Sequence, residues 1–241
     1  MQYKFNKNYF DEIDTEEKAY WIGFIWCDGY LGIRNRGNRK TEYNLNVRLM
    51  EEDKEHLEKL NKCLEGNYPI KIFPNGKGRF KETNYCRLFI TNRHLGETLS
   101  NKYGIIPHRL DCSKLLSSIP NHLIKHFIRG CYDADGSFSK YQAHDNTREK
   151  EYINTKYNLA LGTTPMLVDF VEEHFIEKEL ISNMKRAKLK RHKEEGRDIG
   201  YINLSICGKG QFYNCLDYLY KDSKIYLDRK YEKYLRFSKE K

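Results

Sequence analysis

The sequence predicts an α+β protein of two tandem halves, each with the order helix, strands, helix, strands, helix. A segment ending in Asp-Gly occurs twice, with its aspartates at Asp28 and Asp135, 107 residues apart. Similar strand-like segments follow each copy, and they alternate polar and apolar residues with a period of two. That alternation is typical of an antiparallel sheet with one buried face. We place the halves at 1–117 and 118–241, with the joint near 113–121, where Ser-Ser-Ile-Pro-Asn interrupts the pattern.

Composition narrows the class of protein. The 241 residues carry a formal net charge of +9, which favours a polyanionic partner. No run of about 18 apolar residues is present, so we expect no membrane partner, and no apolar segment near the N-terminus resembles a secretory signal. Seven cysteines without a C-x-x-C pair argue against a disulfide framework and a zinc ribbon. We therefore expect an intracellular, cytoplasmic protein.

In the first half, the opening helix should end at Gly29, because glycine just past a helix end is a favoured stop. Alternating strands follow at 40–49 and 85–90, with Leu45 and Val47 on the apolar face of the first. Between them, Leu57, Leu60 and Leu64 mark a helix, the loop 74–81 is basic, and another helix is expected at about 94–103.

The second half repeats this plan. Its opening helix should end at Gly136, and strands are expected at 157–161 and 200–206. The residues 142–156 are polar and predict a long loop or an extended hairpin, and 185–193 is too basic to be core. Helices are expected around Leu167–Phe175, at about 209–220 and at 225–237, the last from its amphipathic spacing.

The two Asp-Gly helices are expected to pack against each other. Gly23 and Cys27 are four residues apart and share one helix face, as do Gly130 and Ala134, so each helix offers a stripe of small residues. Such packing would set the two aspartates side by side at the unfavourable ends of two helix dipoles. A bound divalent cation would relieve that repulsion, and oxygen ligands favour Mg²⁺.

These residues resemble the LAGLIDADG homing endonucleases, specifically the single-chain type with two motif copies. The copies are Trp-Ile-Gly-Phe-Ile-Trp-Cys-Asp-Gly, ending at Gly29, and Ile-Arg-Gly-Cys-Tyr-Asp-Ala-Asp-Gly, ending at Gly136. The second is close to the family consensus. The first has Trp26 in place of the first Asp and Cys27 in place of Ala, but it keeps the later, essential Asp.

The resemblance implies two αββαββα halves related by a pseudo-twofold axis, whose antiparallel sheets form a saddle over the DNA major groove. Asp28 and Asp135 would be the catalytic, metal-binding acids, and the carbonyls of Cys27 and Ala134 auxiliary metal ligands. The ion would be Mg²⁺, with Mn²⁺ as a substitute. A lysine after the last strand of a half often lies near the attacking water in this family, and Lys209 occupies that place, with Arg93 in the matching place of the first half.

Double-stranded DNA should be read by the polar faces of the sheets and by the basic segments beside them, because Arg, Lys, Asn and Tyr contact base edges and phosphates. The residues we assign to DNA binding are Arg34, Lys40, Asn44, Asn46, Arg48, Lys77, Arg79, Lys81, Arg87, Ser139, Tyr141, Arg186, Lys188, Lys190, Tyr201 and Asn203.

The expected function is a site-specific DNA endonuclease. It would act as a monomer and make a metal-dependent double-strand break in a long asymmetric target, in the homing of an intron or a similar mobile element. Two alternatives stay open: an RNA-binding maturase that would bind intron RNA, for instance through the basic helix 225–237, and a DNA-binding regulator that does not cleave. Retention of both acids favours the enzyme over the regulator.

Overall fold

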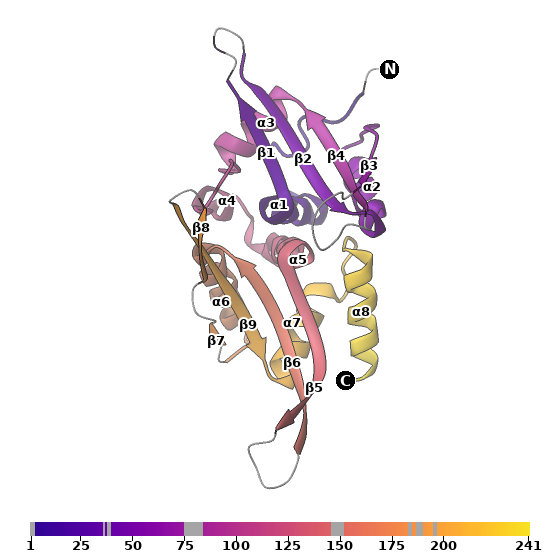
Figure 1. Cartoon of the computed structure of the whole chain (residues 1–241), viewed down its shortest axis with the longest axis vertical. Helices are drawn as coiled ribbons and strands as arrows, with labels where there is room; N and C mark the ends of the chain where they lie inside the picture. The colour runs from indigo at the N-terminus through magenta and orange to yellow at the C-terminus, as the bar shows by residue number, and fades with distance from the viewer. Residues whose placement is uncertain are drawn as a thin grey trace.

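The computed structural model describes residues 3–35, 37, 40–74, 84–145, 152–182, 185–186, 190–194 and 197–241. Two antiparallel sheets are formed, one from each half of the sequence. The helices α1 (Glu16–Asp28) and α5 (Ile124–Asp135) lie together at the centre, and the sheets extend from them in opposite directions (Figure 1).

The first sheet has the strand order β1-β2-β4-β3. Its strands are β1 (Gly29–Arg34), β2 (Glu42–Met50), β3 (Lys71–Pro74) and β4 (Asn84–Thr91). The helical segments of this half are the 3₁₀ turn Glu51–Asp53, α2 (Lys54–Cys63), α3 (Arg93–Glu97), the π-helical turn Thr98–Lys102 and α4 (Ser113–Ser117). Most of the predicted basic loop 74–81 lies outside the described residues.

The second sheet repeats the arrangement with the order β5-β6-β9-β7, and β8 also pairs with β9. Its strands are β5 (Gly136–Asp145), β6 (Tyr152–Thr163), β7 (Lys185–Arg186), β8 (Lys190–Glu194) and β9 (Arg197–Cys207). The helical segments are the 3₁₀ turn Asn121–Leu123, α6 (Pro165–Glu177), α7 (Lys209–Tyr220) and α8 (Asp228–Lys239). Of the two options for 142–156, the flanking strands β5 and β6 form the extended hairpin.

Each sheet has one buried and one solvent-facing side, as the alternation predicts. In β2, Leu45 and Val47 are buried, and their partners Ile90 and Leu88 on β4 are buried with them. In the second sheet, the paired residues Leu161 and Leu204 occupy the same role. All seven cysteines are free thiols. No helix within the described ranges has both the length and the apolar character needed to cross a membrane.

The close approach of α1 and α5 depends on two glycines. A Cβ atom on Gly130 would lie 2.0 Å from the carbonyl oxygen of Tyr20, and one on Gly23 would lie 2.3 Å from the carbonyl oxygen of Phe127. Both neighbours are main-chain atoms, so no side-chain rotation relieves the overlap. The stripe of small residues therefore lets the two backbones touch, and it fixes how the ends of both helices lie relative to each other.

We expect Gly130→Ala to lower the free energy of unfolding by about 2 kcal/mol. Overpacking costs about 3 kcal/mol, and the better helix propensity of alanine returns about 1 kcal/mol. The matched control is Gly210→Ala in α7, where nothing lies within 4 Å of the added Cβ. That variant should be neutral or slightly more stable. Equal denaturant midpoints for the two variants would contradict the backbone contact.

Candidate active site and nucleic-acid interface

Asp28 and Asp135 are the last residues of α1 and α5, and the packing of the two helices brings their carboxylates together. Asp28 keeps contact with solvent, and Asp135 is half-buried. The protein packed around the Asp28 carboxylate, and then the charge of Asp135, raise the pKa of Asp28 to about 7. Burial also raises the pKa of Asp135, against the opposing charges of Lys230 and Arg109. Each acid is thus costly to ionise without a nearby cation.

The donor chemistry of this site fits a hard divalent ion. No three His, Cys, Asp or Glu side chains converge on one point anywhere in the described part of the chain, so the protein offers two carboxylates. The residues before them, Cys27 and Ala134, lie in the last helical turns, whose carbonyls lack a following helical amide. Contact with Cys131, together with burial, raises the pKa of the Cys27 thiol. Few carboxylates plus water is the usual environment of Mg²⁺.

Each helix end is also held by one cation from a distant part of its own half. The Arg109 guanidinium donates to the carbonyl oxygens of Ile25 (3.1 Å), Trp26 (2.8 Å) and Gly29 (2.9 Å). The Lys230 ammonium, on α8, donates to those of Tyr132, Asp133 (2.8 Å) and Gly136 (2.7 Å). The second set of carbonyls is the first set moved by 107 residues. The two cations therefore contact equivalent carbonyls of the repeat, although they come from different positions in it, and both offset the negative ends of the helix dipoles.

The sequence did not single out Arg109 or Lys230 for this site. The sequence did contain one indication of such a cation. Each helix ends in an acid, yet neither α1 nor α5 has a basic residue in its last turn. A cation from elsewhere in the chain was therefore needed.

The structure does not bring Lys209 to the acids. Its ammonium lies 3.4 Å from the carbonyl oxygen of Lys241, just past the end of α8, whereas Lys230 occupies the first turn of that helix near the acids. The matching residue Arg93 pairs with Glu97 at the surface, 2.7 Å away. Both lie after the last strand of their half as predicted, but those strands end away from the centre.

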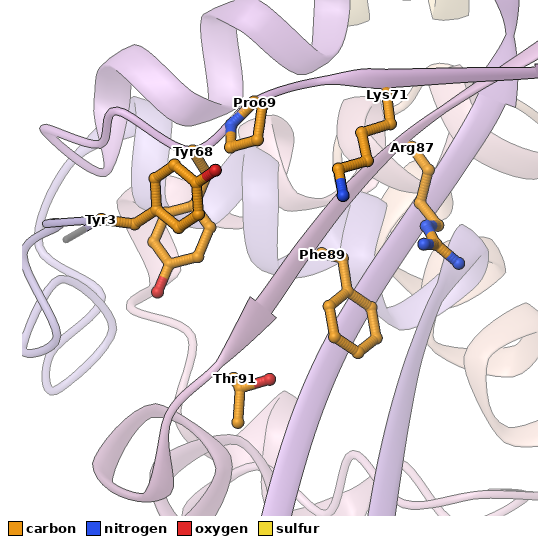
Figure 2. Close-up of a pocket in the computed structure, with 7 residues that line it drawn as sticks. All are labelled: Tyr3, Tyr68, Pro69, Lys71, Arg87, Phe89 and Thr91. Atoms are coloured by element: carbon orange, nitrogen blue, oxygen red, sulfur yellow. The ribbon is translucent and has the colours of Figure 1, made fainter. Parts of the chain in front are cut away.

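The solvent face of the first sheet carries a row of three cations. Arg48 on β2 stands opposite Arg87 on β4, which stands opposite Lys71 on β3. The Arg48 guanidinium lies 4.3 Å from the ring centre of Tyr85, and that of Arg87 lies 4.6 Å from that of Phe73. Like charges directly opposite each other are destabilising unless an anion lies across them. Figure 2 shows Lys71 and Arg87 side by side at one edge of this face.

Asn44 is buried, although its polar position on the strand predicted an exposed side chain that contacts DNA. It lies on the same face as the half-buried Asn46, but only 7% of it is exposed. Its amide oxygen accepts from the Thr91 hydroxyl at 2.6 Å, and its amide nitrogen donates to Glu42 at 3.2 Å. Gly32 pairs with Asn44 across the strands. The Tyr30 ring lies over Gly32, 3.5 Å from where a Cβ atom on that residue would be. Gly32 leaves room for that ring beside Asn44, so the polar pattern alone misjudged exposure.

The remaining predicted contacts fall into two groups. Arg34, Lys40, Tyr141 and Asn203 are exposed, and Ser139 is half-buried on β5. In backbone register, Arg186 stands opposite Leu204 and Lys190 opposite Tyr201. Lys77, Arg79, Lys81 and Lys188 lie outside the described residues, as do the side chains of Arg186, Lys190 and Tyr201.

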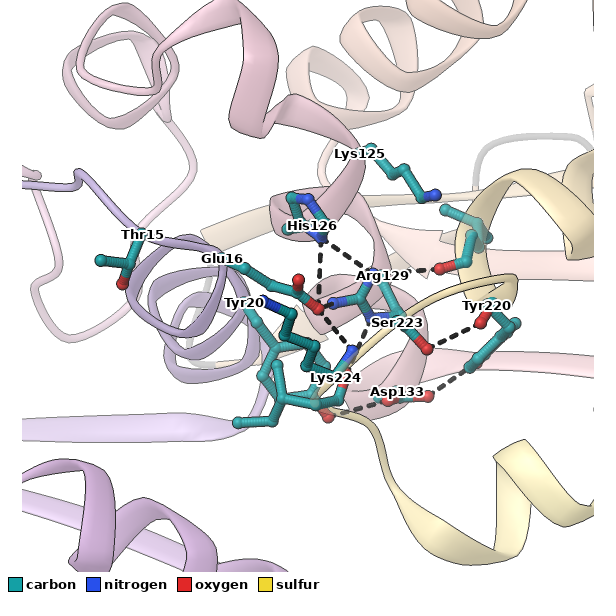
Figure 3. Close-up of polar contacts among 12 residues, drawn as sticks. Thr15, Glu16, Tyr20, Lys125, His126, Arg129, Asp133, Tyr220, Ser223 and Lys224 are labelled. Atoms are coloured by element: carbon teal, nitrogen blue, oxygen red, sulfur yellow. Dashed lines mark hydrogen bonds and ion pairs between the residues drawn. The ribbon is translucent and has the colours of Figure 1, made fainter.

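Ionic contacts join the two halves around the central helices. The fully buried Arg129 of α5 donates to Glu16 of α1 at 2.8 Å (Figure 3). It also donates to the carbonyls of Leu219 and Ile225. On α8, Arg229 donates to both carboxylate oxygens of Asp53 in the first half, at 3.0 and 2.9 Å. Because these pairs hold α1 and α8 against the opposite halves, they fix the placement of both acids.

A buried carboxylate lies below the acids. Asp133 is 1% exposed and accepts hydrogen bonds from the Tyr20 hydroxyl (2.8 Å), the Tyr220 hydroxyl (2.6 Å) and the Leu227 amide (2.8 Å). Burial raises its pKa, and Lys230 is the main opposing influence. Three donors and a nearby ammonium are what a buried charge of this kind requires. Asp133 therefore organises the helix interface, while Asp28 and Asp135 remain at its open end.

Comparison with solved structures gives the relationship of this architecture to known proteins. The meganuclease I-AabMI, solved with uncleaved DNA, matches 92% of this chain and 88% of its own with a TM-score of 0.58 and 14% sequence identity. I-SmaMI bound to cleaved DNA matches 95% and 89% with a TM-score of 0.57 and 15% identity.

The chain has the LAGLIDADG meganuclease fold. I-LtrWI bound to target DNA agrees with this, with a TM-score of 0.58 at 11% identity over 93% and 89% of the two chains. No model of a known protein family matches the sequence, and no curated protein matches it either. The likeness to these solved structures is thus one of fold, at 11–15% sequence identity.

The helix interface of this LAGLIDADG fold predicts a pH dependence of stability. The Tyr20 hydroxyl gives its only hydrogen to Asp133, so His56 Nε2, 3.0 Å away, must donate to Tyr20. A second proton would enter on Nδ1, which is buried and has no partner among the described residues. Burial, followed by the charge of Lys59, lowers the pKa of His56 from 6.5 to about 3.

We expect His56 to contribute a fall in the free energy of unfolding as the pH is lowered from about 6 to 4, whereas the raised pKa of Asp28 contributes in the opposite direction. In this window the unfolded chain binds a proton at His56 that the folded chain does not, so folding loses about 1.4 kcal/mol per pH unit from this group. His56→Phe keeps the aromatic packing and removes the titration. The free energy of unfolding of the wild type minus that of this variant, both measured with denaturant, should therefore decrease as the pH is lowered through this window. Parallel curves would exclude His56 as the source.

Proposed function

We propose that this protein is a site-specific DNA endonuclease that makes a metal-dependent double-strand break in a long asymmetric target. The observation that carries the proposal is the meeting of Asp28 and Asp135 at paired helix ends, between two sheets with polar, solvent-facing sides. Structurally similar proteins have been solved bound to uncleaved and to cleaved DNA, which supports the same substrate here. Homing of an intron or a similar mobile element is the biological role we infer.

Asp28 and Asp135 would hold Mg²⁺, or Mn²⁺ in its place, with help from the carbonyls of Cys27 and Ala134. A bound ion of this type would lower the pKa of a water and offset the charge that develops on phosphate. A similar structure, that of I-SmaMI, was solved in the presence of calcium ions, which is consistent with a divalent ion in the related site.

The protein's own contribution is to position charge. Arg109 and Lys230 fix the last turns of both helices, so the two carboxylates keep their orientation when phosphate approaches. Both cations also lie close enough to influence the pKa of Asp135. We therefore assign the cationic role in the reaction to Arg109 and Lys230, in place of Lys209 and Arg93.

The two halves would bind different half-sites as one monomer, with 1–117 and 118–241 as the units. Arg87 on β4 is replaced by Asn203 at the matching place of β9, and Asn46 by Ala160, so the faces offer different side chains to the bases.

Asp28→Asn and Asp135→Asn should each lower cleavage by at least about 100-fold, because each removes a charged oxygen ligand at the reacting phosphate. The substrate is the DNA that flanks the gene, joined as it would be without the inserted element. Cleavage is followed on gels with Mg²⁺, and binding is measured separately with Ca²⁺. Binding should persist in both variants.

Two controls accompany this test. Asp14→Asn removes an exposed carboxylate that pairs with Lys18 at the start of α1, away from the acids, and should leave cleavage unchanged. Lys209→Met should also retain activity. Full activity in Asp28→Asn would overturn the site, and binding by the wild type without cleavage in any divalent metal would favour the regulator.

The cation row predicts a loss of base discrimination. Arg48→Gln should reduce the preference for the cognate base pair at one position by roughly 1–3 kcal/mol, because a bidentate contact to a base is lost. Affinities for single-base variants of the site, measured with Ca²⁺, give this value. Arg236→Gln removes an exposed cation from α8, which is not part of the cation row on the first sheet, and should leave the preference profile unchanged. An unchanged profile for Arg48→Gln would remove Arg48 from the reading surface.

A further inference from the structure

Two large aromatic rings are exposed in one row across the solvent face of the first sheet. Tyr30 on β1 pairs with Asn46 on β2, and Asn46 pairs with Phe89 on β4. Side chains opposite each other on adjacent strands are about 5 Å apart at Cβ, so the two rings flank one amide. Tyr30 is 53% exposed and Phe89 is 40% exposed. Neither ring is used by the cleavage site described above.

The Phe89 ring is an apolar spot on an otherwise polar strand face. Figure 2 shows it on β4 between Arg87 and Thr91. Pairing of β3 with β4 begins at Lys71, opposite Arg87, so the ring keeps an open side. A single exposed ring is ordinary on a protein surface. Two rings in register on the face that meets DNA in the proposed function would both be covered by that DNA.

Asn46, between the rings, has hydrogen-bonding capacity that the protein leaves unused. Its amide oxygen is shielded from water and has no hydrogen-bond partner among the described residues. That state is unfavourable for a buried acceptor. The neighbouring Asn44 differs, because its amide already binds Thr91 and Glu42. Rotation of the Asn46 amide toward a base edge would satisfy its oxygen, and an asparagine amide pairs with N6 and N7 of adenine.

The major groove of DNA offers one apolar group, the 5-methyl of thymine. In an A·T pair this methyl lies in the same groove as N6 and N7 of adenine. An amide beside an apolar ring therefore matches the groove edge of one A·T pair. The next row along the strands, formed by Arg48, Arg87 and Lys71, carries cations, which match the acceptors of guanine.

The equivalent row of the second sheet has no ring. Ser137 on β5 pairs with Ala160 on β6, and Ala160 pairs with Ser205 on β9. These three residues stand at the matching places of the repeat. They offer neither an amide nor an aromatic surface, so the chemistry of the first row belongs to one half of the chain.

We propose that the row Tyr30–Asn46–Phe89 reads one A·T base pair of duplex DNA, with Asn46 on N6 and N7 of adenine and Phe89 against the 5-methyl of the paired thymine. Tyr30 shields the other side of Asn46. The proposal rests on the proposed function, because it takes double-stranded DNA as the ligand of this sheet face. It adds the identity of one base pair, in the half-site bound by residues 1–117.

Deoxyuridine tests the methyl contact, because it pairs like thymidine and lacks only the 5-methyl group. Each thymine of the target duplex is replaced singly, and affinity is measured with Ca²⁺ by fluorescence anisotropy. One replacement, in one half-site, should weaken binding by the wild type about 3- to 5-fold, the contribution of one buried methyl group. Phe89→Ala should bind the unmodified duplex more weakly and show no further loss with this replacement. Phe89→Leu keeps an apolar contact and should stay sensitive.

A second replacement tests the Asn46 contact at the same base pair. 7-Deazaadenine opposite the sensitive thymine lacks the N7 acceptor, and it should weaken binding by the wild type about 2- to 10-fold, as for one hydrogen bond. Asn46→Ala should not respond to it. The matched control is Ile72→Ala, which removes an exposed apolar side chain from the opposite face of the same sheet, since Ile72 pairs with the buried Cys86. This variant should respond to both replacements as the wild type does.

Tolerance of deoxyuridine at every thymine would overturn the proposal, and so would a methyl effect that persists in Phe89→Ala. A 7-deazaadenine effect that persists in Asn46→Ala would remove the amide from the contact and refute the row as a unit. In each of these cases the duplex is still bound and can still be cut, so the proposed function stands. A wild-type protein that binds no duplex would instead overturn both.

Discussion

The contact of two helix backbones at Gly23 and Gly130 determines most of this structure. It brings the ends of α1 and α5 together, and so places two carboxylates where helix dipoles and mutual repulsion both oppose ionisation. Arg109 and Lys230 offset this unfavourable charge by donating hydrogen bonds to the carbonyl oxygens at the helix ends. The open side above the carboxylates remains available for a cation. The geometry of the site is therefore a consequence of helix packing, and under the proposed function the sheets would align DNA over it.

Much of the fold could be predicted from the sequence because its signals are local. The Asp-Gly segments, the small-residue stripes and the period-2 alternation each depend on nearby residues, and they identified the central helices, β2, β4, β6 and β9. Asp28 and Asp135 followed from the same local pattern. Their common position at the interface required only that the two stripes pack on each other.

Contacts between distant residues were out of reach for the same reason. Arg109 and Lys230 reach the helix ends only because two chain segments return there, 80 residues after the first motif and 94 after the second. Lys209 illustrates the opposite error, because its place after a strand was right while the strand itself leads away from the acids. Asn44 shows that alternation predicts the side of a sheet but not how neighbouring side chains cover it.

The buried carboxylate of Asp133 has a consequence for how the chain descended and how it can be re-engineered. Its counterpart in the first repeat is Trp26, and its hydroxyl partner Tyr20 has Phe127 as counterpart. A homodimer built from the second half alone would set Asp133 against a ring that offers no hydroxyl, leaving a buried charge short of a donor. A homodimer of the first half would contain no such carboxylate at all. We therefore expect a chimaera to keep this hydrogen bond only if it transplants both sides of the joint, Tyr20 together with Asp133.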